Sequence, residues 1–405
     1  MELTAIRIQE SPLAKGRRRL IGTVAYDDQG RPPEEYWFDV PERQAASLSV
    51  SGNPWAVALL PLAITLGQPL RLALPVDGLL LENLQELQQI WACWYPHLRP
   101  VPLEADAAES TPRTEKGRTA AFFSGGVDSW FTVLSHSAPR AEAKTGTIDE
   151  LLCVWGFDVA IDSPDVFREM RASLQEAATD LGMELVDVAT NLRATRWRQA
   201  NWALLSHGAG LASIALTLGD RYARVLVGSS GDYNDLTPWG SHVLTDPLFS
   251  TRQTTIIYDG AAFNRVRKTE LVATSDIAMR SLRVCWKSRG YQNCCACEKC
   301  YRTMLALELF GALDRCSTFP QHALDLTAVP RIYFNPHVCR SEYDPLVAWA
   351  QERGRPDIAA AIGRAAQRSE RLAIWLKLLE KLKHKPLVWR LAAFLEREVL
   401  ARRFT

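Results

Sequence analysis

The residues of this chain best suited to chemistry begin with one short run, Ser124-Gly125-Gly126-Val127-Asp128-Ser129. The apolar segment RTAAFF before the run predicts a buried strand, and DSWFTVLSHS at its end predicts a helix. Backbone N–H groups of such a turn and of the helix N-terminus can converge on an anion, and two glycines let the backbone approach a phosphate. Ser124 and Ser129 add hydroxyl donors, so the run predicts a phosphate-binding loop.

Asp128 is unusual in a phosphate-binding loop, because a carboxylate repels phosphate. Its presence is understandable if it helps to hold a magnesium ion or fixes the loop from inside. The run lacks the Gly-Lys-Ser/Thr ending that defines the P-loop of kinases and GTPases. A glycine turn that merely precedes a capped helix is the alternative interpretation, and the full hexapeptide between a strand and a helix argues against it.

A second group of reactive residues is a cysteine cluster, which holds five of the nine cysteines. Four of them follow the spacing Cys-x8-Cys-x2-Cys-x2-Cys, formed by Cys285, Cys294, Cys297 and Cys300. Four thiolates suit a closed tetrahedral zinc site, which adds stability without catalysis. An iron–sulfur cluster is the alternative occupant of such a site. Cys295 is left over, or competes with Cys294 for a ligand position.

Predicted strands and helices alternate from residue 118 onward. After the phosphate-binding loop, further strands are predicted at LLCVWGFD, MELVDVAT and ARVLVGSS, with helices at PDVFREMRASLQEAATDLG and NWALLSHGAGLASIALTLGD. This alternation predicts an α/β fold with a doubly wound parallel sheet and helices on both faces. Ligands of such sheets collect at the carboxyl ends of the strands, where Gly228 and Ser229 follow the fourth strand.

We predict three domains in these 405 residues. Residues 1–105, with short strands and one helix, predict an N-terminal α+β accessory domain. Residues 104–117 predict a polar linker, and residues 118–318 the α/β domain with its cysteine cluster. Residues 320–405 predict a helical C-terminal extension. Its excess of Lys and Arg is either a solvated helix face or a docking surface for an acidic partner such as tRNA.

Composition excludes several other classes of protein. A net charge of +1 gives no global attraction to nucleic acid or to a membrane. No run of about 18 apolar residues predicts a transmembrane helix, and the N-terminal segment has no apolar core of a secretion signal. Cysteines that are clustered in one segment point to a metal site in a reducing compartment. We therefore expect a cytoplasmic protein with no membrane partner.

The phosphate-binding loop resembles the SGGxDS signature of the PP-loop ATP pyrophosphatases. Because the cysteine pattern follows about 155 residues later, residues 118–312 resemble 7-cyano-7-deazaguanine synthase and its relatives. The resemblance implies that ATP is split into AMP and pyrophosphate, with the loop holding the β- and γ-phosphates and magnesium neutralising the leaving group. It also implies zinc rather than an iron–sulfur cluster at the four cysteines.

The resemblance assigns further residues to the site. It places Val154 and Gly156 near the adenine, and it matches Lys268 and Arg302 to basic residues of the family that would stabilise charge at the α-phosphorus. Lys268 is otherwise a surface charge. The predicted catalytic residues are Asp128, Lys268 and Arg302. The predicted nucleotide-binding residues are Ser124, Gly125, Gly126, Val127, Ser129, Val154, Gly156, Gly228 and Ser229.

The reaction implied by the resemblance is adenylation of a small-molecule carboxylate, after which ammonia or an amine displaces AMP. In the synthase the carboxylate is 7-carboxy-7-deazaguanine, and related proteins of bacterial defence systems attach a deazapurine to the N-terminus of a protein. The additional domains of this chain suit a macromolecular acceptor, a protein or a tRNA, better than ammonia. We also expect a homodimer.

The chain departs from the synthase where the substrate would bind. In place of a Gly-Tyr-Pro-Asp-Cys run it has NDLTPWGSHVLTDPLFS, which contains Asp235, Trp239, His242 and Asp246. A tryptophan there could stack on a flat ring, and His242 could act as a general base. A packed loop with satisfied polar groups is the alternative interpretation.

Two other functions stay open on the sequence. A sulfur-inserting enzyme, which would thiolate its substrate, needs a reactive thiol, and Cys153 is its candidate. Cys153 lies in an apolar strand, where a cysteine is usually an inert core residue. A non-catalytic module that binds nucleotide and nucleic acid would bind ATP without hydrolysis and release nucleic acid at high salt.

Overall fold

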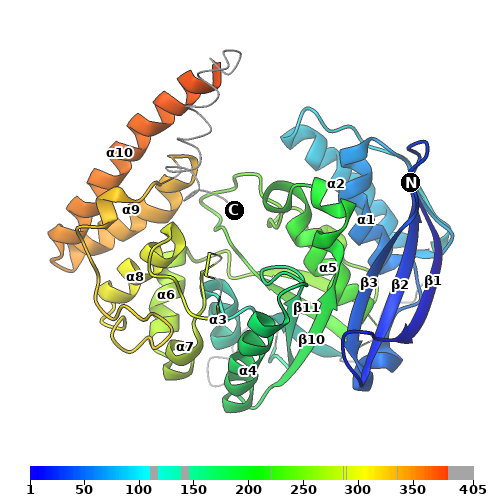
Figure 1. The fold of residues 1–405 in the computed structure, drawn as a ribbon, viewed down its shortest axis with the longest axis horizontal. Helices are drawn as coiled ribbons and strands as arrows, with labels where there is room; N and C mark the ends of the chain where they lie inside the picture. Colours follow the sequence, from blue (N-terminus) through cyan, green and yellow to red (C-terminus); the bar gives the residue numbers. More distant parts are fainter. Residues whose placement is uncertain are drawn as a thin grey trace. The chain divides into compact units, whose positions relative to one another are not determined.

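The computed structural model describes residues 1–381 apart from 110–116, 138–145, 220, 286, 289 and 335. It divides into two compact units (Figure 1). The first unit comprises Met1–Ser124 and Asp128–Ala262, and the second unit comprises Gly125–Val127 and Phe263–Thr405. The three-domain organisation stays a prediction; half of the expected linker and the end of the C-terminal extension lie outside the described residues.

A ten-stranded, mostly parallel sheet organises the first unit and confirms the predicted α/β class. Five neighbouring strands run parallel in the order β12 (Thr255–Asp259), β11 (Tyr222–Gly228), β8 (Arg118–Phe122), β9 (Glu150–Trp155) and β10 (Glu184–Thr190). The predicted strands around the phosphate-binding loop are thus all present. Their apolar residues are buried because helices cover both faces of the sheet.

The N-terminal strands extend this sheet beyond β10. They follow in the order β3 (Glu34–Pro41), β2 (Arg17–Ala25), β1 (Glu2–Glu10), β4 (Leu70–Leu72) and β6 (Leu103–Glu104), and β5 (Val76–Asp77) pairs separately with β7 (Ala107–Ala108). The junction is antiparallel, with Ala189 of β10 opposite Asp39 of β3. Arg17 stabilises it by pairing with Asp39 on β3 and Asp187 on β10.

The helices of the first unit lie on both faces of the sheet. They are α1 (Asn53–Leu66), α2 (Gly78–Trp94), α3 (Val127–Ser135), α4 (Pro164–Asp180) and α5 (His207–Thr217), with short turns at Glu42–Ser47, Leu192–Ala194, Arg196–Gln199, Trp202–Ser206 and Asp246–Phe249. Since βαβ crossovers are right-handed, α3 and α4 must cover one face and α5 the other. Figure 1 shows α4 and α5 on opposite sides of the sheet, and α1 packs beside α5.

The strand order reverses direction between β8 and β11. The chain moves from β8 to β9 and β10 on one side, then returns to β11 and β12 on the other side of β8. The connections that leave the carboxyl ends of β8 and β11 therefore diverge to opposite faces. In open α/β sheets ligands bind at such a reversal.

The second unit is helical. It contains α6 (Arg265–Ala273), α7 (Asp276–Ser281), α8 (Glu298–Leu309), a turn at Val329–Arg331, α9 (Pro336–Glu352) and α10 (Pro356–Lys381). Leu305 on α8, Leu346 on α9 and Ile362 on α10 meet in one apolar cluster. Across the described part of both units, no helix has the length and apolarity to span a membrane.

Candidate functional site

The predicted phosphate-binding loop lies at the carboxyl end of β8, between Phe122 and the first residue of α3, Val127. Gly125 has φ 77°, a conformation that glycine adopts without the strain a side chain would bring. Ser124 is exposed, whereas Ser129 is buried on the first turn of α3. The first N–H groups of a helix have no intrahelical acceptor, so the α3 terminus adds positive potential to the loop.

The connection after β11 packs directly against this loop. A Cβ on Gly228 would lie 2.9 Å from the carbonyl oxygen of Asp128 and 3.2 Å from the amide nitrogen of Ser129. Ser229 donates its backbone N–H to the carbonyl oxygen of Asp259, 2.7 Å away, at the end of β12. The structure therefore brings Gly228 and Ser229 beside the loop, at the point where the strand order reverses.

The end of β9 lies at the same edge of the sheet. Val154 is half-buried, and Gly156 has φ 110° with the carbonyl oxygen of Thr190 in the place of a Cβ. A side chain at Gly156 would clash with that carbonyl, so glycine is required there. Because β9 is the parallel neighbour of β8, both residues are at the edge that carries the phosphate-binding loop.

A buried ion pair between His136 and Asp259 lies at the carboxyl end of β12, at the same edge of the sheet. His136 donates from Nε2 to Asp259, at 3.0 Å, and its Nδ1 lies 3.1 Å from the carbonyl oxygen of Gly146. Both ring nitrogens face acceptors, an arrangement that favours the doubly protonated imidazole. The hydrogen bond to Asp259 raises the pKa of His136 against the opposing effect of burial. Thr132 donates to the same carboxylate at 2.8 Å.

The segment expected to bind substrate is tightly packed around Asp246. This carboxylate is buried and accepts from the Ser241 hydroxyl at 2.6 Å and from the His242 amide at 3.0 Å. Burial raises the pKa of Asp246 to about 7. Gly208, in the first turn of α5, approaches the same carboxylate so closely that a Cβ would overlap it. Asp246 therefore belongs to a packed loop with satisfied polar groups, the alternative interpretation of this segment.

The other residues of that segment are also engaged. The ring of His242 packs edge-on against Trp94, with centroids 4.9 Å apart, and burial lowers the pKa of this histidine. Asp235 accepts from the backbone N–H and the hydroxyl of Thr237, as in an Asx turn. Trp239 is half-buried. A neutral His242 keeps the capacity to accept a proton, whereas Asp235 shapes the loop.

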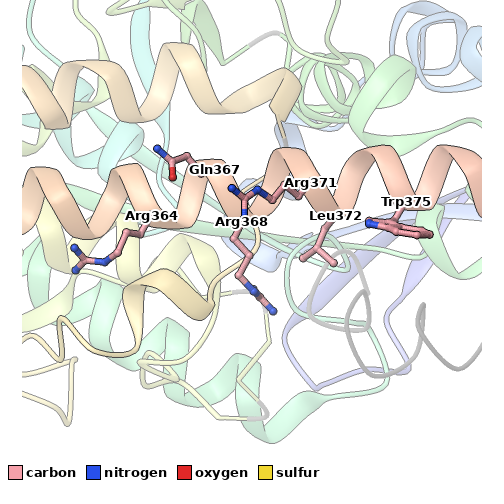
Figure 2. A pocket seen from close by; sticks show the side chains of 6 residues that line it. All are labelled: Arg364, Gln367, Arg368, Arg371, Leu372 and Trp375. Atoms are coloured by element: carbon pink, nitrogen blue, oxygen red, sulfur yellow. The ribbon is translucent and has the colours of Figure 1, made fainter.

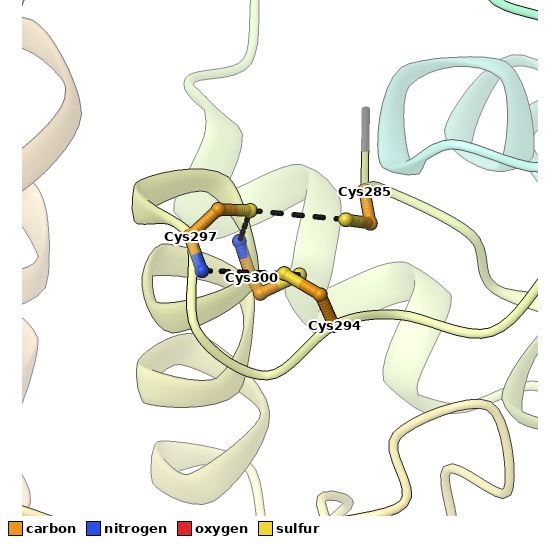
Figure 3. Close-up of side chains that lie close together, drawn as sticks. All are labelled: Cys285, Cys294, Cys297 and Cys300. Carbon is orange, nitrogen blue, oxygen red and sulfur yellow. Dashed lines mark hydrogen bonds between the residues drawn. The ribbon is translucent and has the colours of Figure 1, made fainter. Parts of the chain in front are cut away.

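The four predicted metal ligands converge in the second unit (Figure 3). Their sulfur atoms all lie within 4.8 Å of one another, with 3.9 Å between Cys285 and Cys297 and 3.8 Å between Cys294 and Cys300. Four thiolates around one tetrahedral ion at about 2.3 Å stand about 3.8 Å apart. This cluster can hold a metal ion, and its spacing is consistent with zinc.

Backbone donors complete the cysteine cluster. Lys287 and Ser288 donate N–H groups to the sulfur of Cys285 at 3.3 and 3.2 Å, and Cys297 donates to Cys294 at 3.3 Å. Such bonds stabilise thiolate charge. Hydrogen bonds from Cys294 and the other two thiols lower the pKa of Cys285, whereas the same proximity raises the pKa of Cys300. Four thiolates this close together repel one another, and a bound cation would offset their charge.

Cys295 is outside the cluster. Asn293, two residues before it, carries no sequence motif but has a structural role. Cys295 has φ 53°, and its sulfur points to the carbonyl of Asn293. The buried Asn293 side chain accepts from the amides of Val284 and Cys285, at 2.9 and 3.1 Å, and donates to the carbonyl of Leu282 at 2.9 Å. The Asn293 side chain thus holds the segment that contains Cys285 against the segment that contains Cys294. An amide next to a cysteine carries no motif, so only the fold identifies it.

The same segment contacts the phosphate-binding loop. Arg283, two residues before the first cysteine, donates its backbone N–H to the carbonyl oxygen of Gly125 at 2.8 Å. Its guanidinium is buried and donates to the carbonyl of Tyr291 at 3.1 Å. The backbone that leads into the cysteine cluster therefore supports Gly125.

The two predicted basic catalytic residues are both buried in the second unit. Lys268 lies on α6 and is 2% exposed, so it is not a surface charge. Arg302 lies on α8 and pairs with Glu342 at 2.9 Å and with Glu298 at 3.5 Å. Arg302 therefore has a defined structural role, and its action on a phosphate stays a prediction, as does that of Lys268.

Comparison with protein-family models, curated proteins and solved structures finds no match. The resemblance of residues 118–312 to the 7-cyano-7-deazaguanine synthases therefore stays a prediction. The fold, the meeting of two loops at the strand reversal and the four-cysteine cluster stand on the geometry alone.

Proposed function

We propose that this chain is an ATP-dependent enzyme of the PP-loop ATP pyrophosphatase type, which adenylates a carboxylate and transfers the acyl group to ammonia or an amine. One observation carries the proposal: Gly228 packs on the backbone of Asp128 and Ser129, at the reversal of strand order. Two glycine-containing turns and a helix N-terminus then share one edge of the sheet. Such a site favours an anionic nucleotide.

In the proposed mechanism the Ser124–Ser129 loop binds the β- and γ-phosphates. Its hydroxyl groups and the α3 terminus offset charge that grows on pyrophosphate as it leaves. Asp128 would help to hold a magnesium ion, which supplies further neutralisation of the leaving group. Val154 and Gly156 would border the adenine.

The chemistry that follows is a double displacement. A carboxylate oxygen of the substrate attacks the α-phosphorus, the bond to pyrophosphate breaks, and an acyl adenylate forms. The amine then attacks the acyl carbon, AMP leaves and the amine loses a proton. Lys268 would stabilise charge at the α-phosphorus. Arg302 would do the same after leaving Glu342.

We also assign zinc to the four cysteines. The donors are all thiolates and their spacing suits a single tetrahedral ion, whereas the four cysteines of an iron–sulfur cluster surround two or four irons. The zinc would be structural, since all four coordination positions are filled by the protein. It would hold in place the Arg283 backbone that supports Gly125.

The sulfur-transfer alternative is disfavoured by one observation. Cys153 lies on β9 and is 1% exposed, and burial raises the pKa of its thiol well above the ordinary value. A reactive cysteine needs an exposed thiolate. A Cys153→Ser variant should therefore keep full activity, and loss of activity with retained folding would reinstate the alternative.

Isotope exchange between pyrophosphate and ATP tests the adenylation step. The full-length protein is incubated with ATP, magnesium, labelled pyrophosphate and a panel of carboxylates that begins with 7-carboxy-7-deazaguanine. We expect exchange that depends on the carboxylate, and AMP release when ammonium is added. Formation of ADP instead of AMP would contradict the proposal, as would tight ATP binding with no exchange across a panel that includes protein carboxylates.

Metal analysis of the purified protein tests the zinc assignment. We expect one zinc per chain and loss of that zinc in Cys297→Ser. The matched control is Cys295→Ser, in the same segment but outside the cluster, which should keep its zinc. Iron with acid-labile sulfide in the anaerobically purified protein would overturn the assignment.

A further inference from the structure

A row of basic residues with one aromatic residue runs along the exposed side of α10. Its members are Arg364, Arg368, Arg371 and Trp375, and together with Gln367 and Leu372 they line a hollow at the helix surface (Figure 2). The spacing of four, three and four residues keeps all four on one side of a helix. At 1.5 Å per residue the row is about 16 Å long. We call these four residues the α10 stripe.

The positive charge of the α10 stripe is not neutralised by described carboxylates. Arg364 and Arg371 form no ion pair with any residue that the structure describes. Arg368 donates to the backbone carbonyl of Arg331 at 2.8 Å, a neutral acceptor that fixes the side chain and leaves its charge. Glu370 falls about a third of a turn from Arg371, off the stripe.

Trp375 adds an unusual feature, because its indole is 65% exposed. Folding gains nothing from an aromatic ring left in water, so an exposed tryptophan beside arginines suits a contact with a partner. The chain continues with the same charge: residues 364–405 contain 11 Lys and Arg against 4 Asp and Glu, an excess of 11 − 4 = 7.

We propose that the α10 stripe binds a single-stranded polynucleotide. Arginines contact successive phosphates, and the Trp375 ring stacks on a base, the combination by which such strands are held without sequence preference. The three arginines, within a row of about 16 Å, can thus contact a few successive phosphates of one strand. This inference does not depend on the ATP chemistry proposed above.

Two other partners fit the α10 stripe less well. A membrane-surface helix needs a wide apolar face, but in the first half of α10 that face is already covered: Ile358, Ile362 and Ala365 lie in the core cluster with α8 and α9. Ser369 on the same side accepts the backbone N–H of Phe334 at 2.9 Å. An acidic peptide would pair with the arginines but would leave the exposed indole without a planar partner.

Fluorescence anisotropy with a labelled 12-nucleotide uridine strand tests the proposal on the full-length protein. We expect saturable binding that weakens with salt, and a salt slope that falls by about 2 when three phosphate contacts are removed in the triple variant Arg364→Gln, Arg368→Gln, Arg371→Gln. The matched control is Arg7→Gln, Arg99→Gln, Arg168→Gln, which removes the same charge from exposed sites of the first unit. The control should keep the wild-type slope.

Substitutions of Trp375 distinguish base stacking from the attraction between charges. Trp375→Ala should weaken binding by about fivefold or more at fixed salt, and Trp375→Phe should restore most of it, because one stacked base contributes on the order of a fivefold change. Neither variant should alter the salt slope. A purely electrostatic tail would show no difference between alanine and phenylalanine.

Four outcomes would overturn the proposal. These are no binding of the strand at low salt, equal weakening by the triple variant and its control, no effect of Trp375→Ala, and tighter binding to polyglutamate or to phosphatidylserine vesicles than to the strand. Circular dichroism of each variant checks that the helices remain. Because the substituted side chains are exposed, the variants should fold.

Discussion

The two ends of the parallel strands in the first unit are built from different residues. At the amino ends, Glu150 is fully buried and receives hydrogen bonds from Arg221 and from Tyr222, each at 2.7 Å, and it also pairs with Arg118. At the carboxyl ends of β8, β9 and β11 stand glycines and serines. The charged side chains at the amino ends neutralise one another, whereas backbone groups line the carboxyl ends.

We therefore expect the amino ends of these strands to contribute to stability and the carboxyl ends to bind the nucleotide. Burial alone would raise the pKa of Glu150, but hydrogen bonds from Arg221 and Tyr222 hold that pKa below its ordinary value. The carboxylate is thus ionised and committed to the fold. Gly228 and Gly156, at the other end, have no side chains, so the backbone of Asp128 and of Thr190 packs directly against them.

The largest expected effect is loss of activity on substitution at the carboxyl end. Gly228→Val would push a side chain into the backbone of Asp128 and displace the phosphate-binding loop. We expect the rate of pyrophosphate exchange to fall about 100-fold, since displacements near 1 Å have that effect. Gly363→Ala is the control, because no atom lies near the added methyl group. An unchanged rate of pyrophosphate exchange in Gly228→Val would contradict the proposed role of the carboxyl ends.

Substitution at the amino end should act on stability instead. Glu150→Ala leaves Arg221 and Tyr222 without their acceptor, and we expect the free energy of unfolding to fall by about 3–5 kcal/mol. Urea titration measures it, with Glu169→Ala, at an exposed position, as the control. The variant should keep the wild-type affinity for ATP below its unfolding midpoint. Weakened ATP binding in the folded variant would show that the two ends are not separate.

Asp246 provides a pH test at the carboxyl end. Its pKa is about 7 in the folded chain against 3.8 for an ordinary aspartate, so the folded state binds the proton more tightly. Stability is therefore lost as pH rises from about 4 to about 7, relative to Asp246→Asn, by up to about 4 kcal/mol. Urea titrations of both proteins across this range measure the difference. A constant difference would mean that Asp246 ionises normally.

His136 should give a dependence of the same sign, at higher pH, and a smaller effect. Its pKa is raised above the ordinary 6.5 by Asp259, so its contribution is present below pH 6.5 and lost as pH rises through the raised value. The other groups that face it are the Gly146 carbonyl and, at longer range, the Arg224 cation, which lowers the pKa. We expect about 2 kcal/mol between the wild type and His136→Asn at low pH.

Nitrogen-15 NMR of the His136 ring checks this interpretation. Both ring nitrogens should carry protons at pH 6, as in an imidazolium. A neutral ring at pH 6 would contradict the ion pair with Asp259.

Local spacing was enough to predict the α/β fold, the strand and helix that flank Ser124–Ser129, and the cysteine cluster. The ligands Cys294 and Cys297 are three residues apart, and the strand before Ser124 is a continuous apolar run. Such patterns are visible because the interacting groups are near each other in the chain.

Contacts between distant segments were not predictable. Nothing in β3 indicates that it pairs with β10, about 150 residues later, because an antiparallel pairing leaves no local motif. Arg302 gains a role only from Glu342, which folding brings to it. Burial of Asp246 also depends on Gly208, on another element.

Hydrogen exchange with and without ATP and magnesium tests the central claim most directly, because it needs no carboxylate substrate. The account predicts slower exchange in peptides that cover residues 122–135 and 226–232, at the carboxyl ends, and no change in a peptide that covers residues 148–153, at the amino end of β9. Gly228→Val should abolish the protection. Protection at the amino ends, or none in either region at saturating ATP, would contradict the assignment of the nucleotide site.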